Sequence, residues 1–281
     1  MRVTIKNEYG SIDMQGGGHP TWNITDYDGL GLPPKTYNIV QYAGSAGQRT
    51  LSETAQARTI TIGGDIGGQY PAQEVTKATK MFYWPVDVII YVGNKHRRAR
   101  CRVTSFSAEQ GHIYRKFTLQ MVSDSPYFED LDAQSIMVHE RTNHLLGRFS
   151  FESASSKIQF STLTTESDII NLGDVQTEPI FYVSNNTGAT ITDGFAILKN
   201  GGEQKISVSA SIDDGETVTV DIPSRRITGS NGRNLIDTIS DDTFLSDFWL
   251  DVGTNHIEVE SGNKNLSVRC EYTNQYVEAM L

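Results

Sequence analysis

Residues 116–129 read KFTLQMVSDSPYFE, and this stretch divides the chain into two parts. Apolar residues alternate with polar or smaller ones in its first half, at Phe117, Leu119 and Met121. This alternation predicts a strand with one buried face. Pro126 ends the pattern, because proline has no N–H for a sheet ladder and favours an extended residue before it. Tyr127 and Phe128 follow as two aromatic anchors, so we expect a domain to end here.

The length and the charge distribution agree with this division. At 281 residues the chain exceeds the usual size of a single hydrophobic core. Residues 1–130 carry 14 Lys and Arg against 12 Asp and Glu, a net of +2, whereas residues 131–281 carry 10 against 22, a net of −12. We therefore expect one domain at 1–130 and another at 131–281. The charge also argues against nucleic-acid binding along the whole chain, which requires a positive field.

The cysteine count and the length of the apolar runs indicate in which cellular compartment the protein is made. Cys101 and Cys270 fall in different predicted domains, and two cysteines in a chain of this length make no disulfide framework, so we expect reduced thiols. The sequence shows neither a positively charged leader with an apolar core nor an apolar run of about 18 residues. We expect a protein that is made in the cytosol and does not enter a membrane.

The first domain is predicted to be an α+β unit dominated by antiparallel sheet. Alternation predicts strands at 2–7, 58–66, 86–92, 95–103 and 113–122. One helix is predicted to begin at Pro71, where the missing N–H of proline costs nothing, and to end before Trp84 and Pro85. Its apolar positions, among them Val75 and Phe82, recur at steps of three and four residues.

Residues 35–57 predict a long hairpin, or arm, with its tip at 44–47. Tyr37, Ile39 and Tyr42 flank the glycine-rich tip, and the polar sequence SETAQA follows. We expect both legs to be half buried. A hairpin with so little apolar content is not stable alone in water, so we expect it to lean on something else, such as another subunit.

The second half predicts a β-sandwich. Turn sequences separate short apolar stretches every 8–12 residues or so, which is typical of this architecture. The predicted strands are 180–183, 195–198, 206–210, 217–222, 244–250, 255–260 and 266–272. Residues 131–149 show only weak strand signals and are expected to form a crossing segment.

No motif for catalysis, for a metal or for a cofactor stands out. The sequence HERTNH at 139–144 spaces its histidines by five, whereas a zinc helix requires four. Asp26 and Asp28 begin a pattern like a calcium loop, but the remaining ligands are missing, so a tight turn is favoured. We find no nucleophile elbow, phosphate loop or CxxC pair. The sequence thus predicts no catalytic, cofactor-binding or metal-binding residues.

Two groups of residues remain as candidates for binding. Arg98, Arg100 and Arg102 share one face of a predicted strand. Nucleic-acid binding there would require a broad positive face, so we favour an exposed face or one that pairs with acidic groups of a neighbouring chain. Trp249 lies near Phe244 and is a candidate saccharide platform, although alternation favours core packing for its neighbours, with Trp249 on the other face.

Several groups of residues, in their order along the chain, form a family pattern. They are RTITI at 58–62, MFYWP at 81–85, SPYF at 125–128, NLGD at 171–174, EP at 178–179, GETVTVD at 215–221, RI at 226–227 and GTN at 253–255. Together they resemble the distal tail protein family of long-tailed phages with non-contractile tails. The resemblance implies a mainly β chain, with an N-terminal domain carrying the arm and a C-terminal sandwich similar to galectins or carbohydrate-binding modules.

The resemblance also implies a function. Such proteins form a hexameric ring, in some cases back to back, between the tail tube protein and the tail-tip protein, and the ring can carry receptor-binding proteins. DNA passes through the lumen without specific binding. We therefore expect a structural protein of a phage or prophage virion, located at the tail tip and assembled in the host cytoplasm. Arg98, Arg100 and Arg102 are expected at a subunit boundary or in the lumen.

Two other functions remain open. A carbohydrate-binding module or adhesin that contacts the host cell wall would use the sandwich and Trp249. An enzyme acting on cell-wall polymer would need paired carboxylates in a cleft, which no motif supports. The ring protein is the favoured function, without enzymatic activity.

Overall fold

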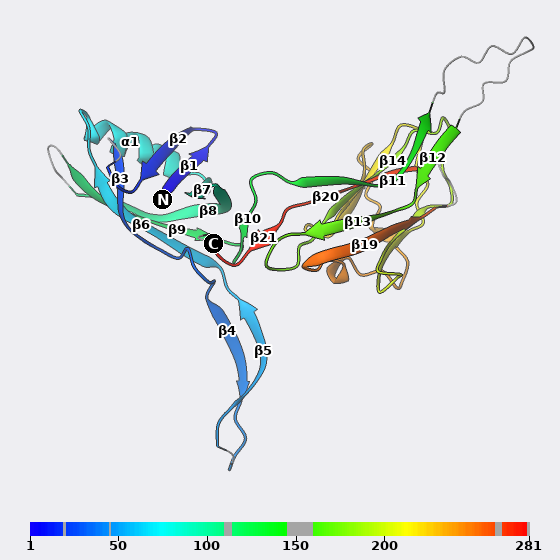
Figure 1. The fold of residues 1–281 in the computed structure, drawn as a ribbon, viewed down its shortest axis with the longest axis horizontal. Coiled ribbons are helices and arrows are strands. Elements are labelled where there is room, and N and C mark those ends of the chain that lie inside the picture. Colours follow the sequence, from blue (N-terminus) through cyan, green and yellow to red (C-terminus); the bar gives the residue numbers. More distant parts are fainter. Residues whose placement is uncertain (19–20, 45, 110–113, 145–159, 262–265, 280–281) are drawn as a thin grey trace, which may run out of the picture. The chain divides into compact units, whose positions relative to one another are not determined.

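The structure is a computed structural model, and it describes residues 1–18, 21–44, 46–109, 114–144, 160–261 and 266–279. For 141–144 and 160–162 it describes only the backbone. The chain folds into two compact units (Figure 1). The first contains Met1–Leu131 together with Gln275–Leu281, and the second contains Asp132–Asn274. The C-terminal residues, which the sequence assigned to the second domain, therefore lie in the first unit.

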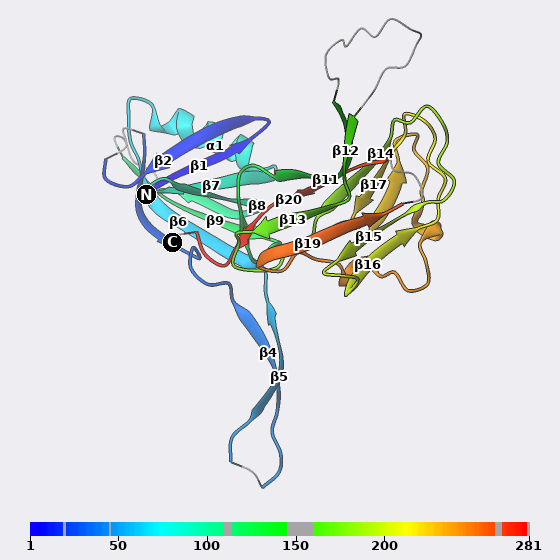
Figure 2. The same ribbon diagram turned by 45° about the vertical axis from the view of Figure 1, so that its right-hand side comes forward.

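The first unit is built on a nine-stranded sheet that closes on itself (Figure 2). In spatial order its strands are β21 (Gln275–Tyr276), β10 (Phe128–Glu129), β8 (Lys95–Ala108), β7 (Val86–Val92), β1 (Arg2–Asn7), β2 (Gly10–Gln15), β3 (Trp22–Asp28), β6 (Arg58–Ile66) and β9 (Arg115–Ser123). Strand β9 pairs with β8 as well as with β6, so the seven strands from β8 to β9 form a barrel. Every pairing is antiparallel except that of β2 with β3, which rests on Gln15 and Asn23.

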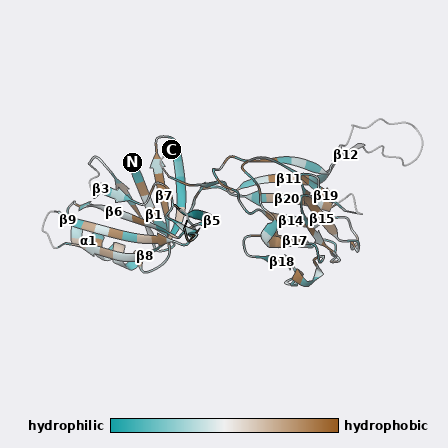
Figure 3. Ribbon diagram, turned by 90° about the horizontal axis from the view of Figure 1, so that it is seen from below, coloured by the Kyte–Doolittle hydropathy of each residue, from teal (hydrophilic) through white to brown (hydrophobic). Residues whose placement is uncertain are grey.

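Alternation along the strands fills the barrel. Inward-facing residues of β6 and β9 such as Ile60, Ile62 and Leu119 are fully buried, and the polar residues between them face outward. Figure 3 shows this change between hydrophobic and hydrophilic residues along the strands. The fold class predicted from the sequence, a mainly β chain with one helix in its first half, is confirmed.

Helix α1 (Pro71–Phe82) packs its apolar stripe on the barrel. Pro71 opens the helix, as predicted, and Glu74 lies in the first turn, where a negative charge suits the helix dipole. Met81 and Phe82 are buried, and the ring of Phe82 meets Phe106 edge to face at 5.1 Å. The helix ends where the sequence turns to Trp84 and Pro85.

The predicted arm is a two-stranded hairpin of β4 (Lys35–Val40) and β5 (Arg49–Ala55). It extends away from the barrel strands (Figures 1 and 2). Only Val40 and Ala55 are half buried among the described residues of the two strands, and the rest are exposed. The expectation of half-buried legs is therefore wrong for the single chain, because none of the described residues covers them.

Arg58 joins the base of the arm to two remote segments. Its side chain is 1% exposed, and all five of its N–H donors bind backbone carbonyls. The acceptors are the carbonyls of Gly29, Gly31, Pro126 and Val277, at 2.6–3.0 Å. The guanidinium carbon lies 4.3 Å from the centre of the Phe128 ring, a cation–π contact. Burial lowers the pKa of Arg58 to about 10.

Position 29 in this cluster requires glycine, for reasons of backbone conformation and of space. Its φ of +82° is in the left-handed region, and a Cβ atom would lie 1.9 Å from the carbonyl oxygen of Thr59. The Asp28 carboxylate accepts a hydrogen bond from the Gly29 N–H at 2.7 Å. The two aspartates that resembled the start of a calcium loop, Asp26 and Asp28, lie on strand β3 and pair with β6, so the tight turn favoured from the sequence is wrong; the chain bends only after them, at Gly29.

The C-terminal segment is fixed in the first unit by several contacts. Strand β21 pairs with β10, and the Ala279 N–H donates to the Leu30 carbonyl at 3.0 Å. The Tyr276 ring lies 3.4 Å from the Arg97 guanidinium carbon, and both side chains bind Asp130. Residues 116–129 thus end beside strand β21, with Phe128 fully buried.

The second unit is a β-sandwich of two sheets. One has the order β12 (Phe160–Thr164), β11 (Gln134–His144), β20 (Leu266–Tyr272), β14 (Ile180–Asn185), β17 (Thr217–Asp221) and β18 (Arg226–Gly229). The other has the order β13 (Glu166–Asn171), β19 (Gly253–Glu260), β15 (Phe195–Lys199) and β16 (Gln204–Val208). Both sheets contribute to one core, for example through Phe181, Val268, Ile197 and Ile257.

Two parts of this unit differ from the prediction. The crossing segment contains the full strand β11, whose signal was weak because a bulge between Met137 and His139 breaks the alternation. At 244–250 the short 3₁₀ helix η2 (Leu245–Asp247) replaces the predicted strand. Leu245 and Phe248 are both buried, and their spacing of three suits a 3₁₀ turn rather than a strand.

No helix in the described part of the chain is long and apolar enough to cross a membrane.

The Arg58 cluster predicts a large cost for its removal. Arg58→Met leaves four carbonyls without their donor, so we expect the free energy of unfolding of the first unit to fall by about 3–5 kcal/mol, as when a buried charged network loses one member. Urea denaturation followed by tryptophan fluorescence measures this change. The exposed Arg49 provides the control, because Arg49→Met should change stability by less than about 0.5 kcal/mol. Equal effects of the two substitutions would contradict the role of Arg58.

Candidate functional site

The arm presents apolar side chains to solvent. Tyr37, Ile39, Tyr42 and Leu51 are each 42–57% exposed. An ion pair joins Lys35 Nζ to Glu53 Oε1 across β4 and β5 at 2.9 Å, and this hydrogen bond raises the pKa of Lys35. An exposed pair of this kind contributes little to stability. The arm is thus an apolar surface on a hairpin that is only marginally stable by itself.

The three arginines of β8 share one outward face, as the sequence predicted. Arg98, Arg100 and Arg102 alternate with Ala99 and Cys101, which are buried in the barrel. The structure therefore brings the three cations together in a row along the outside of the barrel. We call them the arginine row.

Acidic groups of the same unit partly neutralise the arginine row. Arg98 binds Glu129 at 3.0 Å, and Arg102 binds Asp124 at 3.3 Å. Arg100 lies opposite Asp87 in the register of β8 and β7, and the described residues give it no ion pair. The row thus keeps one unpaired cation at its centre, between two pairs that water screens.

Trp249 lies at one end of the sandwich and is held in a fixed orientation. Its neighbours Phe248 and Leu250 are buried, whereas Trp249 is half buried, as alternation predicted. The indole Nε1 donates to Asp251 Oδ1 at 3.0 Å. Lys199 is only 1% exposed. Its Nζ lies 2.5 Å from Asp251 Oδ2 and donates to the Trp249 carbonyl at 2.8 Å. These bonds lower the pKa of Asp251.

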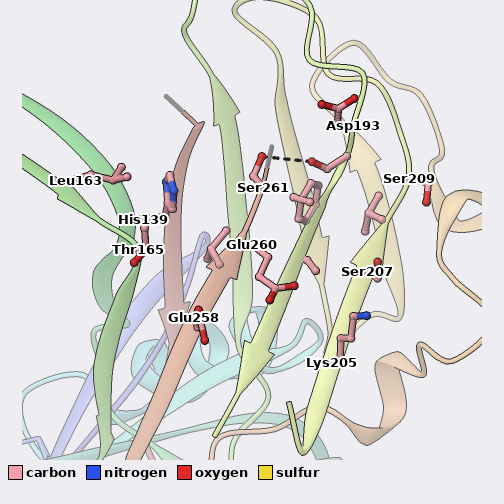
Figure 4. Close-up of a pocket in the computed structure, with 15 residues that line it drawn as sticks. His139, Leu163, Thr165, Asp193, Lys205, Ser207, Ser209, Glu258, Glu260 and Ser261 are labelled. Atoms are coloured by element: carbon pink, nitrogen blue, oxygen red, sulfur yellow. Dashed lines mark hydrogen bonds between the residues drawn. The ribbon is translucent and has the colours of Figure 1, made fainter. Parts of the chain in front are cut away.

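A groove of about 520 Å³ crosses the outer face of the four-stranded sheet (Figure 4). Its lining includes the paired row Glu260–Ala196–Ser207 and the two ends, Glu258 and Lys205, of the next row. Carboxylates therefore line one side, and an amine and a hydroxyl line the other. Phe195 is the only aromatic residue in its lining other than His139, and both are buried. The groove offers hydrogen-bonding groups but no ring on which a ligand could stack.

A histidine between two carboxylates lies on the same sheet. His256 on β19 contacts Asp168 at 2.9 Å and Glu166 at 3.4 Å, both on the neighbouring strand β13. The hydrogen bond with Asp168, followed by the charge of Glu166, raises the pKa of His256. Nothing in the sequence around His256 indicated this cluster, because the two strands are about 90 residues apart in the chain but paired in register.

The described residues contain no group of three His, Cys, Asp or Glu side chains placed to hold a metal ion. His139, from the motif with the wrong zinc spacing, is buried, and its Nδ1 lies 2.6 Å from the Leu266 carbonyl. The side chain of His144 lies outside the described residues. Cys101 and Cys270 are buried free thiols, and burial raises the pKa of Cys101 to about 12. A thiol with so high a pKa is a poor nucleophile at neutral pH.

Comparison with protein families identifies part of the second unit. Residues 172–276 match the family described as the siphovirus-type tail component, C-terminal domain. No relative is found among curated protein sequences.

Comparison with solved structures extends over nearly the whole chain. The SPP1 Dit (gp 19.1) protein, described as a paradigm of the hub adsorption apparatus in phages that infect Gram-positive bacteria, is similar with a TM-score of 0.70. Its identity is 12%, and the match covers 97% of this chain and 98% of that one. A chain of the phage P2 baseplate, in its activated conformation with Ca, gives 0.52 at 12% identity and covers 98% of both chains. The resemblance to distal tail proteins is thus confirmed at the level of the fold.

The cluster around His256 predicts a pH dependence. We expect an NMR titration to place the pKa of His256 above its usual value of about 6.5, and Asp168→Asn to lower it. Because the folded-state pKa is raised, the stabilisation from protonated His256 should be complete below about pH 6.5 and should disappear as the pH rises through the raised pKa. Asp247→Asn, at an exposed carboxylate elsewhere in the unit, should leave the titration unchanged. A pKa at or below 6.5 in the wild type would contradict the geometry.

Proposed function

We propose that this protein forms a closed ring, with six copies the expected number, at the far end of a phage tail. The ring joins the tail tube protein to the tail-tip protein and provides an attachment hub for host-adhesion proteins. The exposed apolar arm is the observation that carries this proposal. The fold likeness to SPP1 Dit and the family match at 172–276 support it.

The arm supports assembly through simple energetics. Burying one Leu, Ile or Tyr side chain contributes about 1.5–3 kcal/mol, and the arm exposes four such residues. A single chain leaves this stabilisation unused and exposes a hairpin that is only marginally stable alone. Contact with a neighbouring copy would bury the apolar residues and order the hairpin in one step.

The barrel is better suited than the sandwich to form the ring, because the arm extends from the barrel. An arm that reaches a different surface of the next copy makes a heterologous contact, and such contacts close into rings when the rotation allows. We assign the ring to the first unit, which carries the arm, and the outward position to the sandwich. In this assignment the ring-forming domain ends near residue 130, and the C-terminal segment from Gln275 belongs to it as well.

The arginine row belongs at a subunit boundary or on the lumen wall in this ring. Arg98 and Arg102 are paired within the chain, so the row presents a moderate charge centred on Arg100. A moderately charged lumen would let DNA pass without holding it, because strong retention requires many unpaired cations along the phosphate backbone.

The proposed role is structural. It requires no catalytic residue and no cofactor, and its partners are further copies of this chain and other tail proteins. We propose the tail tip of the virion as the location, with assembly in the cytoplasm of the host.

Ring formation is tested by removing the apolar residues of the arm. Replacing Tyr37, Ile39 and Leu51 with Ser should weaken assembly at least 100-fold, since about 1.4 kcal/mol corresponds to a factor of ten. Mass photometry and negative-stain electron microscopy measure the ring fraction. The matched control replaces Ile170 and Leu172, which are exposed on the sandwich, with Ser and should leave rings intact. A wild-type protein that stays monomeric at every concentration, alone and with its tail partners, would overturn the proposal.

Saccharide binding by the sandwich is a second candidate function. The specific observation is that Asp251 and Lys199 fix the half-buried Trp249 in one orientation. A rigid ring beside an exposed carboxylate combines a stacking surface with a hydrogen-bond acceptor, which suits a polyhydroxylated ligand.

This second function predicts binding to host cell-wall fragments that depends on the ring. Trp249→Ala should reduce binding at least tenfold in a glycan array or a wall pull-down, because it removes the stacking surface. Phe244→Ala removes an aromatic ring that is also exposed but lacks such bonds, and it should have little effect. Wild-type protein that binds no wall fraction would exclude the candidate.

A further inference from the structure

Three aromatic side chains gather on the surface of the first unit, next to a hollow that Tyr9 and Trp84 share with Arg100. Tyr9, Tyr83 and Trp84 are 53%, 81% and 45% exposed. The rings of Tyr9 and Trp84 stack at 5.3 Å, and Tyr83 meets Trp84 edge to face at the same distance. We call these three residues the aromatic patch. Soluble proteins rarely expose aromatic rings in such a group without a function.

The patch is held in place by the backbone around it. Tyr9 lies in the turn between β1 and β2, and Trp84 lies between α1 and β7. Asn7 connects the two, because its amide donates to the carbonyls of Met81 and Pro85 at 3.0 and 3.3 Å while its oxygen accepts from the Tyr9 N–H at 3.0 Å. The aromatic rings are thus ordered before any partner arrives, which reduces the entropy lost on binding.

A hollow of about 630 Å³ opens between the patch and the last turns of α1. Its remaining lining consists of Lys77, Thr79, Lys80 and Met81. Lys77 and Lys80 are the only charged residues in this lining, and both are exposed. The hollow is therefore an apolar surface with a positive rim, which favours an apolar side chain with a carboxylate nearby.

The arm of a second copy fits this hollow poorly. The arm carries Lys35, Arg49 and Glu53 as its charged residues, and Glu53 is already paired with Lys35. Its net charge is positive, like that of the rim, so the contact would be repulsive. Nucleic acid is also disfavoured, because two lysines at one edge do not make the continuous positive groove that a strand requires, and the chain has a net charge of −10.

We propose that the aromatic patch is the docking site for an acidic, apolar segment of a different tail protein. The inference rests on the proposed role in the tail, and it adds a surface distinct from the arm and adjacent to Arg100 of the arginine row. Trp and Tyr dominate the energetics of protein interfaces, and here they surround a hollow that a single apolar anchor can fill. The two lysines orient the segment through its carboxylates and favour acidic partners over basic ones.

The experiment places a photo-cross-linker in the patch of the full-length chain within assembled tails. Tyr83 is replaced by p-benzoylphenylalanine, the particles are irradiated, and the cross-linked protein is identified by mass spectrometry. A cross-link to another tail protein, at a segment with acidic and apolar residues, is the expected result. A cross-link to a second copy of this chain or to DNA, or no cross-link at all, would overturn the proposal.

Matched variants separate this surface from general effects. Tyr114 is 68% exposed in the same unit, and the cross-linker at that position should not capture the same partner. Lys77→Glu with Lys80→Glu should reduce capture from Tyr83 at least tenfold, whereas Lys77→Arg with Lys80→Arg should retain it. Equal capture by the Glu and Arg variants would also count against the proposal.

Electron microscopy of the same particles distinguishes a failure of the docking site from a failure of the proposed ring. Rings present at the tail tip without capture from Tyr83 leave the proposed function standing and reject the docking site. Absence of the chain from the tails rejects both.

Discussion

The first unit depends on one buried cation. Among the described residues no carboxylate pairs with Arg58, and instead its five N–H groups bind four carbonyls that come from the approach to the arm, the end of the barrel and the C-terminal segment. Burying a charge is costly unless its donors are hydrogen-bonded, and the ring of Phe128 adds a cation–π attraction. These bonds fix where the arm begins and where the chain leaves and re-enters the barrel.

The two exposed surfaces of the first unit, the arm and the aromatic patch, both extend from rigid local structure. The rigid base at Arg58 allows the arm, which has no core of its own, to extend into solvent. The hydrogen bonds of Asn7 fix the backbone around the aromatic patch, so its exposed rings keep their orientation. Both surfaces have the composition of protein interfaces rather than of enzyme clefts. The sandwich adds a fixed tryptophan and a polar groove, each ordered by contacts within its own sheet.

Local patterns in the sequence predicted the elements that depend on local physics. Strand β6, helix α1 beginning at Pro71 and the outward face of Arg98, Arg100 and Arg102 follow from alternation, capping and side-chain direction. The role of Arg58 could not be predicted, because its partners are backbone carbonyls as far as 219 residues away in the chain. Strand β11 was not predicted because its bulge interrupts the alternation of apolar and polar residues. The stacking of Tyr9 on Trp84 was not predicted because the two residues come together only in the folded chain.

The return of the C-terminal segment changes how the two units are connected. Because residues 132–274 lie between β10 and β21 in the chain, the sandwich is an insertion within the first unit and is attached by two covalent strands of chain instead of one. Tension on the sandwich would be divided between these two connections and would reach the barrel through paired strands. A single proteolytic cut at either connection would leave the sandwich tethered to the barrel through the other connection.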